Sequence, residues 1–245
     1  MQKKIMMIAV LILLMFTTAV HAQQLKAGQL IGAWKKGPPE NTIVRIVTDK
    51  YFAATVYDTK TNQYIGTCGG KWRLEGNAFV ELHEFNTLQP EHIGKELRNA
   101  AEIKNGELHL ATNNKTEAWT RVDDGTPGKL PGAWLITGRM VDGSMKPMVP
   151  GARKTMKILS GTRFQWIAYN VDTKEFFGTG GGTYTTDGGR YVEKIDFFSR
   201  DSSRAGMSLS FDFELIDGAW HHRGKSSKGD PIDEVWTRRE TIAGQ

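Results

Sequence analysis

The chain has 245 residues and a net charge of +5, and its 24% charged and 10% aromatic residues are typical of a globular protein with a core. The 27 glycines stand beside only 8 prolines, which places the glycine excess in turns and bulges. The single cysteine, Cys68, excludes an intrachain disulfide and a cysteine-based zinc site. Disorder, coiled coil and collagen are excluded, and the dispersed Lys and Arg residues argue against a nucleic-acid binder.

The first 22 residues have the three-part pattern of a secretory signal peptide. Lys3 and Lys4 precede an apolar run from Ile5 to Phe16, and small residues precede a cleavage point after Ala22. The apolar run is shorter than the roughly 20 residues that cross a bilayer. We therefore expect a mature protein with a net charge of +3, no membrane span, and a place in the periplasm or outside the cell.

The rest of the chain is a tandem repeat. Residues 43–110 align without a gap to residues 155–222, with 17 of 68 positions identical at a constant offset of 112. Gly-Ala-Trp at 32–34 returns at 132–134, and Trp-Thr-Arg at 119–121 returns at 236–238. The repeat predicts two homologous domains, residues 28–123 and 131–240, joined by a turn-forming linker at residues 124–130.

Each repeat predicts a meander of about eight antiparallel strands. In the second repeat, apolar Leu209, Phe211 and Phe213 alternate with polar Ser208, Ser210 and Asp212, which is the pattern of a strand with one buried face. No stretch has a convincing amphipathic-helix pattern. Because closure removes exposed strand edges, we expect an all-β protein of two tandem up-and-down barrels after the signal peptide.

The Gly-Ala-Trp motif on the first strand and the Arg after the last Trp resemble those of the lipocalin-like, or calycin, barrels. The resemblance covers nearly all of residues 30–239. The sequence is also similar to lipocalin-like domains of unknown function in secreted bacterial proteins. In that family the first-strand Trp packs across one end of the barrel under a basic residue of the last strand. The resemblance implies that Trp34 pairs with Arg121, and Trp134 with Arg238. The domains are shorter than standard lipocalins and have no disulfide.

Polar residues on the apolar strand faces are the candidates for chemistry. Glu81 and Glu193 occupy the same aligned position, so each is either a ligand anchor or a structural carboxylate that contacts a Tyr or Arg across the barrel. His83 shares a face with Glu81 and makes an acid–base or metal-ligand candidate, although a third metal ligand is missing. Only one of His221 and His222 can face inward.

The repeats also differ in bulk. Trp166, Phe211 and Phe213 of the second repeat align with Ala54, Asn99 and Ala101 of the first. These differences predict that the lumen of the first barrel is roomier and more polar, unless Trp72 and Tyr51 fill the space. The predicted ligand-contacting residues are Phe52, Trp72, Glu81, His83 and Asn99 in the first barrel, and Trp166, Tyr184, Glu193, Phe211 and His222 in the second.

The sequence therefore predicts a secreted or periplasmic, non-enzymatic protein that binds a small, mostly apolar ligand in a barrel lumen. It predicts no catalytic residues, no cofactor and no metal, and it identifies no protein partner. One alternative is a structural or interaction module of the cell envelope with side-chain-filled barrels. Another is an enzyme that uses Glu81 and His83 for proton transfer.

Overall fold

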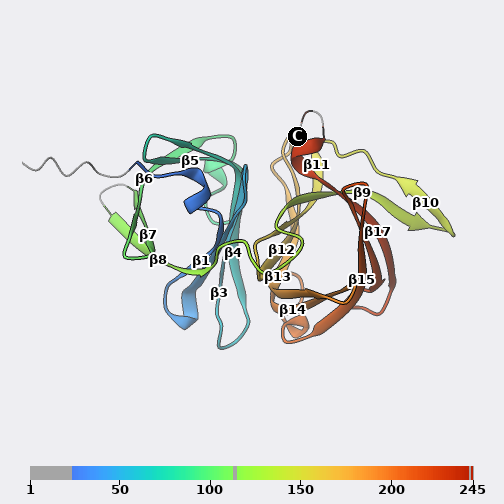
Figure 1. Ribbon diagram of the computed structural model, residues 1–245. Helices are drawn as coiled ribbons and strands as arrows, with labels where there is room; N and C mark the ends of the chain where they lie inside the picture. The colour runs from blue at the N-terminus through green and yellow to red at the C-terminus, as the bar shows by residue number, and fades with distance from the viewer. Residues whose placement is uncertain (1–23, 113–114, 243, 245) are drawn as a thin grey trace, which may run out of the picture.

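Two closed antiparallel barrels follow each other along the chain, as the sequence predicts (Figure 1). The computed structural model describes residues 24–112, 115–242 and 244, so the predicted signal peptide lies outside the described residues. None of the helices in this described part has the length and apolar character needed to cross a bilayer.

Barrel 1 has eight strands in simple sequential order, and β1 closes it by pairing with β8. All its neighbouring strands are antiparallel, joined by short connections that follow the predicted turns. Its strands are β1 (Gly32–Lys36), β2 (Thr42–Val47), β3 (Tyr51–Tyr57), β4 (Tyr64–Glu75), β5 (Ala78–Asn86), β6 (Glu96–Lys104), β7 (Glu107–Thr112) and β8 (Lys115–Asp123).

Barrel 2 repeats this order and closes through the pairing of β9 with β17. The extra strand β10 extends β9 into a hairpin that projects from the barrel (Figure 1). Its strands are β9 (Gly132–Val141), β10 (Ser144–Pro147), β11 (Arg153–Leu159), β12 (Arg163–Asn170), β13 (Phe176–Asp187), β14 (Arg190–Phe198), β15 (Ser208–Ile216), β16 (Ala219–Lys225) and β17 (Pro231–Arg238). Single 3₁₀ turns lie at Ala27–Gln29, Pro39–Asn41, Pro90–His92, Ser202–Arg204 and Arg239–Thr241.

The alternating strand pattern turns the apolar side chains into each barrel. In barrel 1 a buried cluster contains Trp34, Phe52 and Trp119. In barrel 2 the equivalent cluster contains Trp134 and Phe211, with Leu209 half-buried against it. Each barrel therefore has its own core. Removal of these apolar side chains from water stabilises each barrel through the hydrophobic effect.

The Gly-Ala-Trp motif closes one end of each barrel. The Arg121 guanidinium lies over the Trp34 ring at 4.0 Å, and Arg238 lies over Trp134 at 4.4 Å. Arg238 Nη1 also donates to the Pro131 carbonyl oxygen at 2.8 Å. Gly132, at φ 137°, leaves room for this arginine, because a Cβ there would stand 2.2 Å from Arg238 Nη1. In both barrels the motif places an indole under a cation, and in barrel 2 its glycine leaves room for that cation, whereas in barrel 1 a Cβ at Gly32 would meet the Asp123 carbonyl oxygen.

The glycine-rich runs lie where β4 and β13 bend. Both strands shift register by a bulge, between Gly69 and Gly70 in barrel 1 and between Gly181 and Gly182 in barrel 2. A Cβ at Gly69 would meet the Phe85 ring at 2.5 Å, and one at Gly181 would meet Phe197 at 2.7 Å. The missing side chains therefore let the next strand approach closely at the bend.

The segment between the barrels is held in place by Asp123, the last residue of β8. Its Oδ2 accepts hydrogen bonds from Ser160 Oγ at 2.8 Å and Thr162 Oγ1 at 2.6 Å, and its Oδ1 accepts from the Gly161 N–H at 3.0 Å. One buried carboxylate of barrel 1 thus satisfies the β11–β12 turn of barrel 2, and the linker does not act as a loose tether.

A third apolar cluster joins the two barrels. Ile46 and Phe85 on the outside of barrel 1 pack with Met156, Ile167 and Tyr169 on the outside of barrel 2. This interface is additional to the two lumen cores and replaces neither, so the molecule has two barrels with a shared apolar wall.

Candidate functional site

The same ion pair crosses the lumen of both barrels. Arg45 on β2 contacts Glu81 on β5, and Lys157 on β11 contacts Glu193 on β14 with Nζ and Oε1 2.8 Å apart. Arg45 aligns with Lys157, and Glu81 with Glu193, at the repeat offset. Each inward glutamate therefore pairs with a basic residue, and the two basic residues occupy equivalent positions in the two repeats. All four side chains are almost fully buried.

In barrel 1 this pair is part of a filled lumen. The Arg45 guanidinium lies 5.4 Å from the centre of the Phe52 ring and 4.9 Å from that of Trp119. Glu81 Oε2 stands 3.2 Å from His83 Nε2, and His83 Nδ1 stands 3.0 Å from Asn86 Nδ2. Glu81, His83 and Asn86 therefore each have a polar partner in this network, whereas the buried Nε of Arg45 has none among the described residues.

The electrostatics of Glu81 follow from this network. Burial alone would raise the pKa of its carboxyl, but the positive charge of Arg45 and the hydrogen bond from His83 outweigh burial and lower the pKa. The nearby Cys68 thiol shows the opposite balance, because burial and the Glu81 charge raise its pKa to about 12. The cysteine therefore stays a protonated, unreactive thiol.

The remaining predicted residues of barrel 1 contribute to packing. The Trp72 ring stacks on Phe79 with centroids 4.8 Å apart, and its Nε1 donates to the Thr48 carbonyl oxygen at 2.7 Å. Asn99 is 5% exposed and lies opposite Phe79 on the neighbouring strand. Phe52 is fully buried beside the same ring. Large rings thus pack in the same core cluster as Ala101.

Barrel 2 differs because its lumen contains a cavity of about 200 Å³. Most of the wall is apolar and aromatic, and the polar lining includes two acids and two bases. The lining residues are Arg139, Thr155, Lys157, Phe164, Trp166, Gly181, Glu193, Ile195, Phe198, Leu209, Phe211, His222, Ser226, Ser227, Ile232, Glu234 and Trp236. The cavity is large enough for a small ring compound, since an apolar protein cavity of roughly 150 Å³ accepts benzene.

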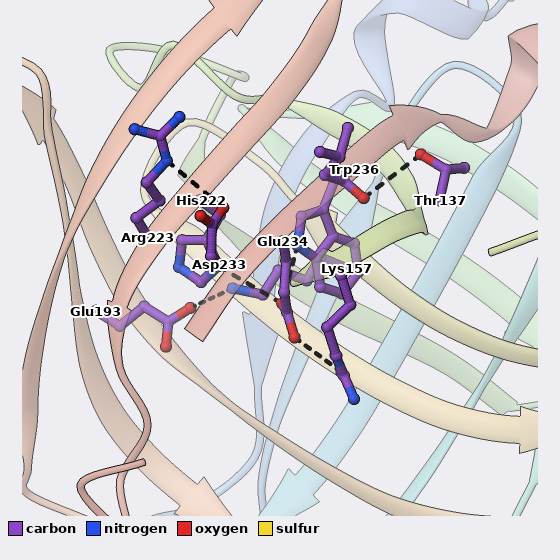
Figure 2. A network of polar contacts seen from close by, with 10 residues as sticks. Thr137, Lys157, Glu193, His222, Arg223, Asp233, Glu234 and Trp236 are labelled. Atoms are coloured by element: carbon purple, nitrogen blue, oxygen red, sulfur yellow. Dashed lines mark hydrogen bonds and ion pairs between the residues drawn. The ribbon is translucent and has the colours of Figure 1, made fainter. Parts of the chain in front are cut away.

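Four aromatic rings surround the ammonium group in this cavity wall. Lys157 Nζ lies 4.9 Å from the centre of the Trp220 ring, and three more rings follow at 5.1 to 5.8 Å. Their electron-rich faces stabilise the ammonium charge, as does the Glu193 carboxylate opposite (Figure 2). The remaining rings are Tyr191, Phe211 and Trp236.

A second polar group lies at the strand β17 side of the cavity. Glu234 accepts hydrogen bonds from Arg139 Nη2 at 2.8 Å and from Trp236 Nε1 at 3.1 Å. Figure 2 shows Glu234 beside Trp236. His222 Nδ1 is 3.8 Å from Glu234 Oε2, too far for a hydrogen bond. Burial would raise the pKa of Glu234, but His222, Lys157 and Arg139 together lower it.

The imidazole of His222 is packed among rings. Its centre is 4.1 Å from that of Phe211, and the side chain is 1% exposed. Burial, followed by the positive charge of Lys157, lowers its pKa to about 4. Neither ring nitrogen has a hydrogen-bond partner among the described residues. His222 is therefore a neutral, polar group in the cavity wall without a hydrogen-bond partner among the described residues.

Some of the predicted ligand-contacting residues line this cavity and others lie elsewhere. Trp166, Glu193, Phe211 and His222 line the cavity, whereas Tyr184 lies outside it and donates its hydroxyl to the Ser160 carbonyl oxygen at 2.6 Å. The five residues predicted in barrel 1 do not line this cavity. The cavity described here lies in barrel 2, while the Arg45 guanidinium and large rings occupy the lumen of barrel 1, so the roomier first barrel stays a prediction.

Sequence reasoning missed Lys157, Arg139, Glu234 and Trp236 as lining residues. A signal for the first of these was present, because Arg45 and Lys157 are aligned bases within strands of otherwise apolar inward residues. Arg139 gives no such signal. Where β9 pairs with β17, the register shifts between Val235 and Trp236. Arg139 lies on β9 beyond this shift, which changes which side chains of the two strands face inward.

The acid–base pair of the enzyme hypothesis is within hydrogen-bond reach but enclosed. Glu81 and His83 are each 3% exposed and bound to Arg45 and Asn86, so they lack the solvent connection that proton transfer to a substrate requires. Across residues 24–112, 115–242 and 244, no three His, Cys, Asp or Glu side chains are grouped in a way that could hold a metal ion.

Comparison with known proteins adds no further assignment. No protein-family model matches the chain, and no curated protein matches it in sequence. The fold and the cavity thus define the class on their own: a tandem pair of eight-stranded antiparallel barrels, of which the second has a cavity in its lumen.

Proposed function

We propose that this protein is a non-enzymatic binding protein that holds a small, mostly apolar molecule in the lumen of barrel 2. The observation that carries the proposal is the cavity of about 200 Å³, with its aromatic wall and few polar groups. This composition is typical of small-molecule sites in proteins. Barrel 1, whose lumen is filled, then serves as a rigid support that shares an apolar wall with barrel 2.

We further propose that both barrels are lipocalin-like and that the protein works in the periplasm or outside the cell. The Trp34–Arg121 and Trp134–Arg238 stacks support the first point, because they close one barrel end in each repeat. The pattern of residues 1–22 supports the second. Sequencing the N-terminus of protein from an expressing bacterium tests it: we expect residue 23 first, and an intact Met1 would contradict secretion.

Native mass spectrometry tests the binding function directly. Protein purified without detergent should show an added mass that is lost on unfolding, and refolded apoprotein should gain thermal stability from some members of a panel of small ring compounds, lipids and porphyrins. A ligand at a hundred times its Kd raises the free energy of unfolding by about 2.7 kcal/mol. A clean apo mass together with no thermal shift across the panel would contradict the proposal.

A matched pair of variants assigns the binding to barrel 2. Leu209→Trp places an indole in the cavity wall and should abolish the added mass and the thermal shifts. Leu97→Trp is the control, because Leu97 is the repeat counterpart of Leu209 and lies opposite Glu81 as Leu209 lies opposite Glu193. It should leave binding unchanged. Equal loss of binding in both variants would remove the assignment to barrel 2.

A further inference from the structure

The charges in the cavity wall balance each other. Of the lining residues, Lys157 pairs with Glu193 at 2.8 Å and Arg139 pairs with Glu234 at 2.8 Å. Each base therefore has its own acid. Both acids and the base Lys157 are largely withdrawn from solvent, while Arg139 reaches it with half of its side chain.

His222 adds no charge to this balance. Its pKa of about 4 keeps the imidazole neutral at physiological pH. A carboxylate ligand would bring an uncompensated charge into a wall of aromatic rings, and an ammonium ligand would add a positive charge beside Lys157 and Arg139. Such a charge loses its hydration and costs several kcal/mol unless a free opposite charge meets it. A neutral molecule carries no such cost.

The wall also keeps hydrogen-bond donors in reserve. Lys157 Nζ has three N–H groups, of which one is used by Glu193, while the others face aromatic rings. The two ring nitrogens of His222, one a donor and one an acceptor in the neutral imidazole, have no hydrogen-bond partner among the described side chains. Buried polar atoms without a partner are rare in native proteins and cost about 1–3 kcal/mol each.

We propose, resting on the binding function of barrel 2, that the cavity selects uncharged ring compounds carrying a carbonyl oxygen, which accepts a hydrogen bond from Lys157 while the rings of Phe211 and Trp236 enclose the apolar part. Ketones, lactones and cyclic amides share this chemistry. Because each acid and base in the wall is already paired, ionic ligands are excluded. Among neutral molecules, the remaining N–H groups of Lys157 favour those with a carbonyl oxygen.

Four compounds of nearly equal size separate these two contributions: 1-indanone, indane, indane-1-carboxylate and 1-aminoindane. Binding to the purified full-length protein is followed by quenching of tryptophan fluorescence and by ligand-observed NMR at pH 7. We expect 1-indanone to bind at least tenfold more tightly than indane, as a hydrogen bond from a charged donor provides. The carboxylate and the amine should bind at least about a hundredfold more weakly than 1-indanone.

Two paired variants show whether Lys157 is the donor. The double change Lys157→Met with Glu193→Gln removes the ion pair without leaving a lone charge, and it should reduce the preference for 1-indanone over indane to less than about twofold. Its affinity for indane should be at least that of the wild type, because an apolar side chain replaces a charged one in the wall, and this shows that the cavity is intact. Arg45→Met with Glu81→Gln, the counterpart pair in barrel 1, should keep the tenfold preference.

The outcomes separate this inference from the binding function. Equal binding of indane and 1-indanone, or tight binding of the carboxylate, would overturn the inference and leave a generic apolar site in barrel 2. Retention of the ketone preference in the Lys157 variant would also overturn it. Binding of none of the four compounds overturns it as well, and the native mass of the purified protein then decides the binding function alone.

Discussion

Tyr57 of barrel 1 lies against Phe197 of barrel 2 with ring centroids 5.0 Å apart, and the repeat counterparts Tyr169 and Phe85 make the same contact at 4.8 Å. Each barrel therefore presents the same surface to the other, with a tyrosine on one strand and a phenylalanine on another. This exchange is the relationship found across a two-fold symmetric dimer interface, here within one chain.

The polar contacts follow this symmetry but are unequal in strength. Tyr57 donates to Asp196 Oδ2 at 3.4 Å, whereas Tyr169 donates to the aligned Glu84 Oε2 at 2.7 Å. Glu84 also receives two hydrogen bonds from Arg239, at 2.8 and 2.7 Å. The C-terminal turn of barrel 2 thus ties a buried arginine to barrel 1 on one side only.

Glu84→Gln should destabilise the protein by about 3–5 kcal/mol, because it leaves the fully buried Arg239 without a counter-ion. Urea unfolding followed by tryptophan fluorescence measures the loss. Asp196→Asn is the matched control: its partner Arg163 is less buried, so the loss should be near 1 kcal/mol. Equal losses in the two variants would show that Arg239 is not specially dependent on Glu84.

The lumen ion pairs predict a different response to single and double changes. Arg45→Met should cost about 3–5 kcal/mol, because Glu81 then remains charged and buried beside His83. Arg45→Met combined with Glu81→Leu should recover most of this loss, since two apolar side chains of similar volume replace the pair. The free energy of unfolding from urea titration gives the coupling. Additive losses would mean that the two charges do not interact.

The fold could be predicted from the sequence because its signals are local and occur twice. The alternation around Phe211 and the repeated Gly-Ala-Trp motif each specify a strand or a barrel end without knowledge of the rest of the chain. The aligned Glu81 and Glu193 likewise indicate a carboxylate inside each barrel, and the predicted structural alternative, an arginine across the barrel, is what Glu81 finds in Arg45.

The location of the cavity could not be predicted in the same way. A comparison of bulk at aligned positions counts only side chains that differ, and here it gives barrel 1 the smaller residues Ala54 and Asn99. Free volume depends on every inward side chain, including the long Arg45, whose guanidinium lies among three rings. Whether a lumen is filled is therefore a property of the whole wall.

The stack of Arg238 on Trp134 predicts that one methyl group added at Gly132 destabilises barrel 2. In Gly132→Ala the alanine must adopt the positive φ of Gly132, which is unfavourable for an L-residue. Its Cβ would also lie 2.2 Å from Arg238 Nη1, so the guanidinium must move away from the Trp134 ring. We expect a loss of about 1–3 kcal/mol in thermal or urea unfolding. Gly151→Ala has open space around its Cβ and should change stability by less than about 0.5 kcal/mol. An unchanged midpoint for Gly132→Ala would contradict the role of the arginine stack.

His222 predicts how stability depends on pH. Its native pKa of about 4 lies below the value of 6.5 for an unfolded histidine, so the unfolded chain binds the proton first as the pH falls. The free energy of unfolding should therefore decrease from about pH 6.5 towards pH 4, by up to about 3 kcal/mol. The carboxylates with lowered pKa, such as Glu234, add most of their loss below about pH 4.5, so the interval from pH 6.5 to about 5.5 reports mainly on the histidine. His222→Phe should flatten this interval in urea titrations of the apoprotein, whereas His221→Phe, its less buried neighbour, should keep the slope. A slope that persists in His222→Phe would show that other groups take up the proton.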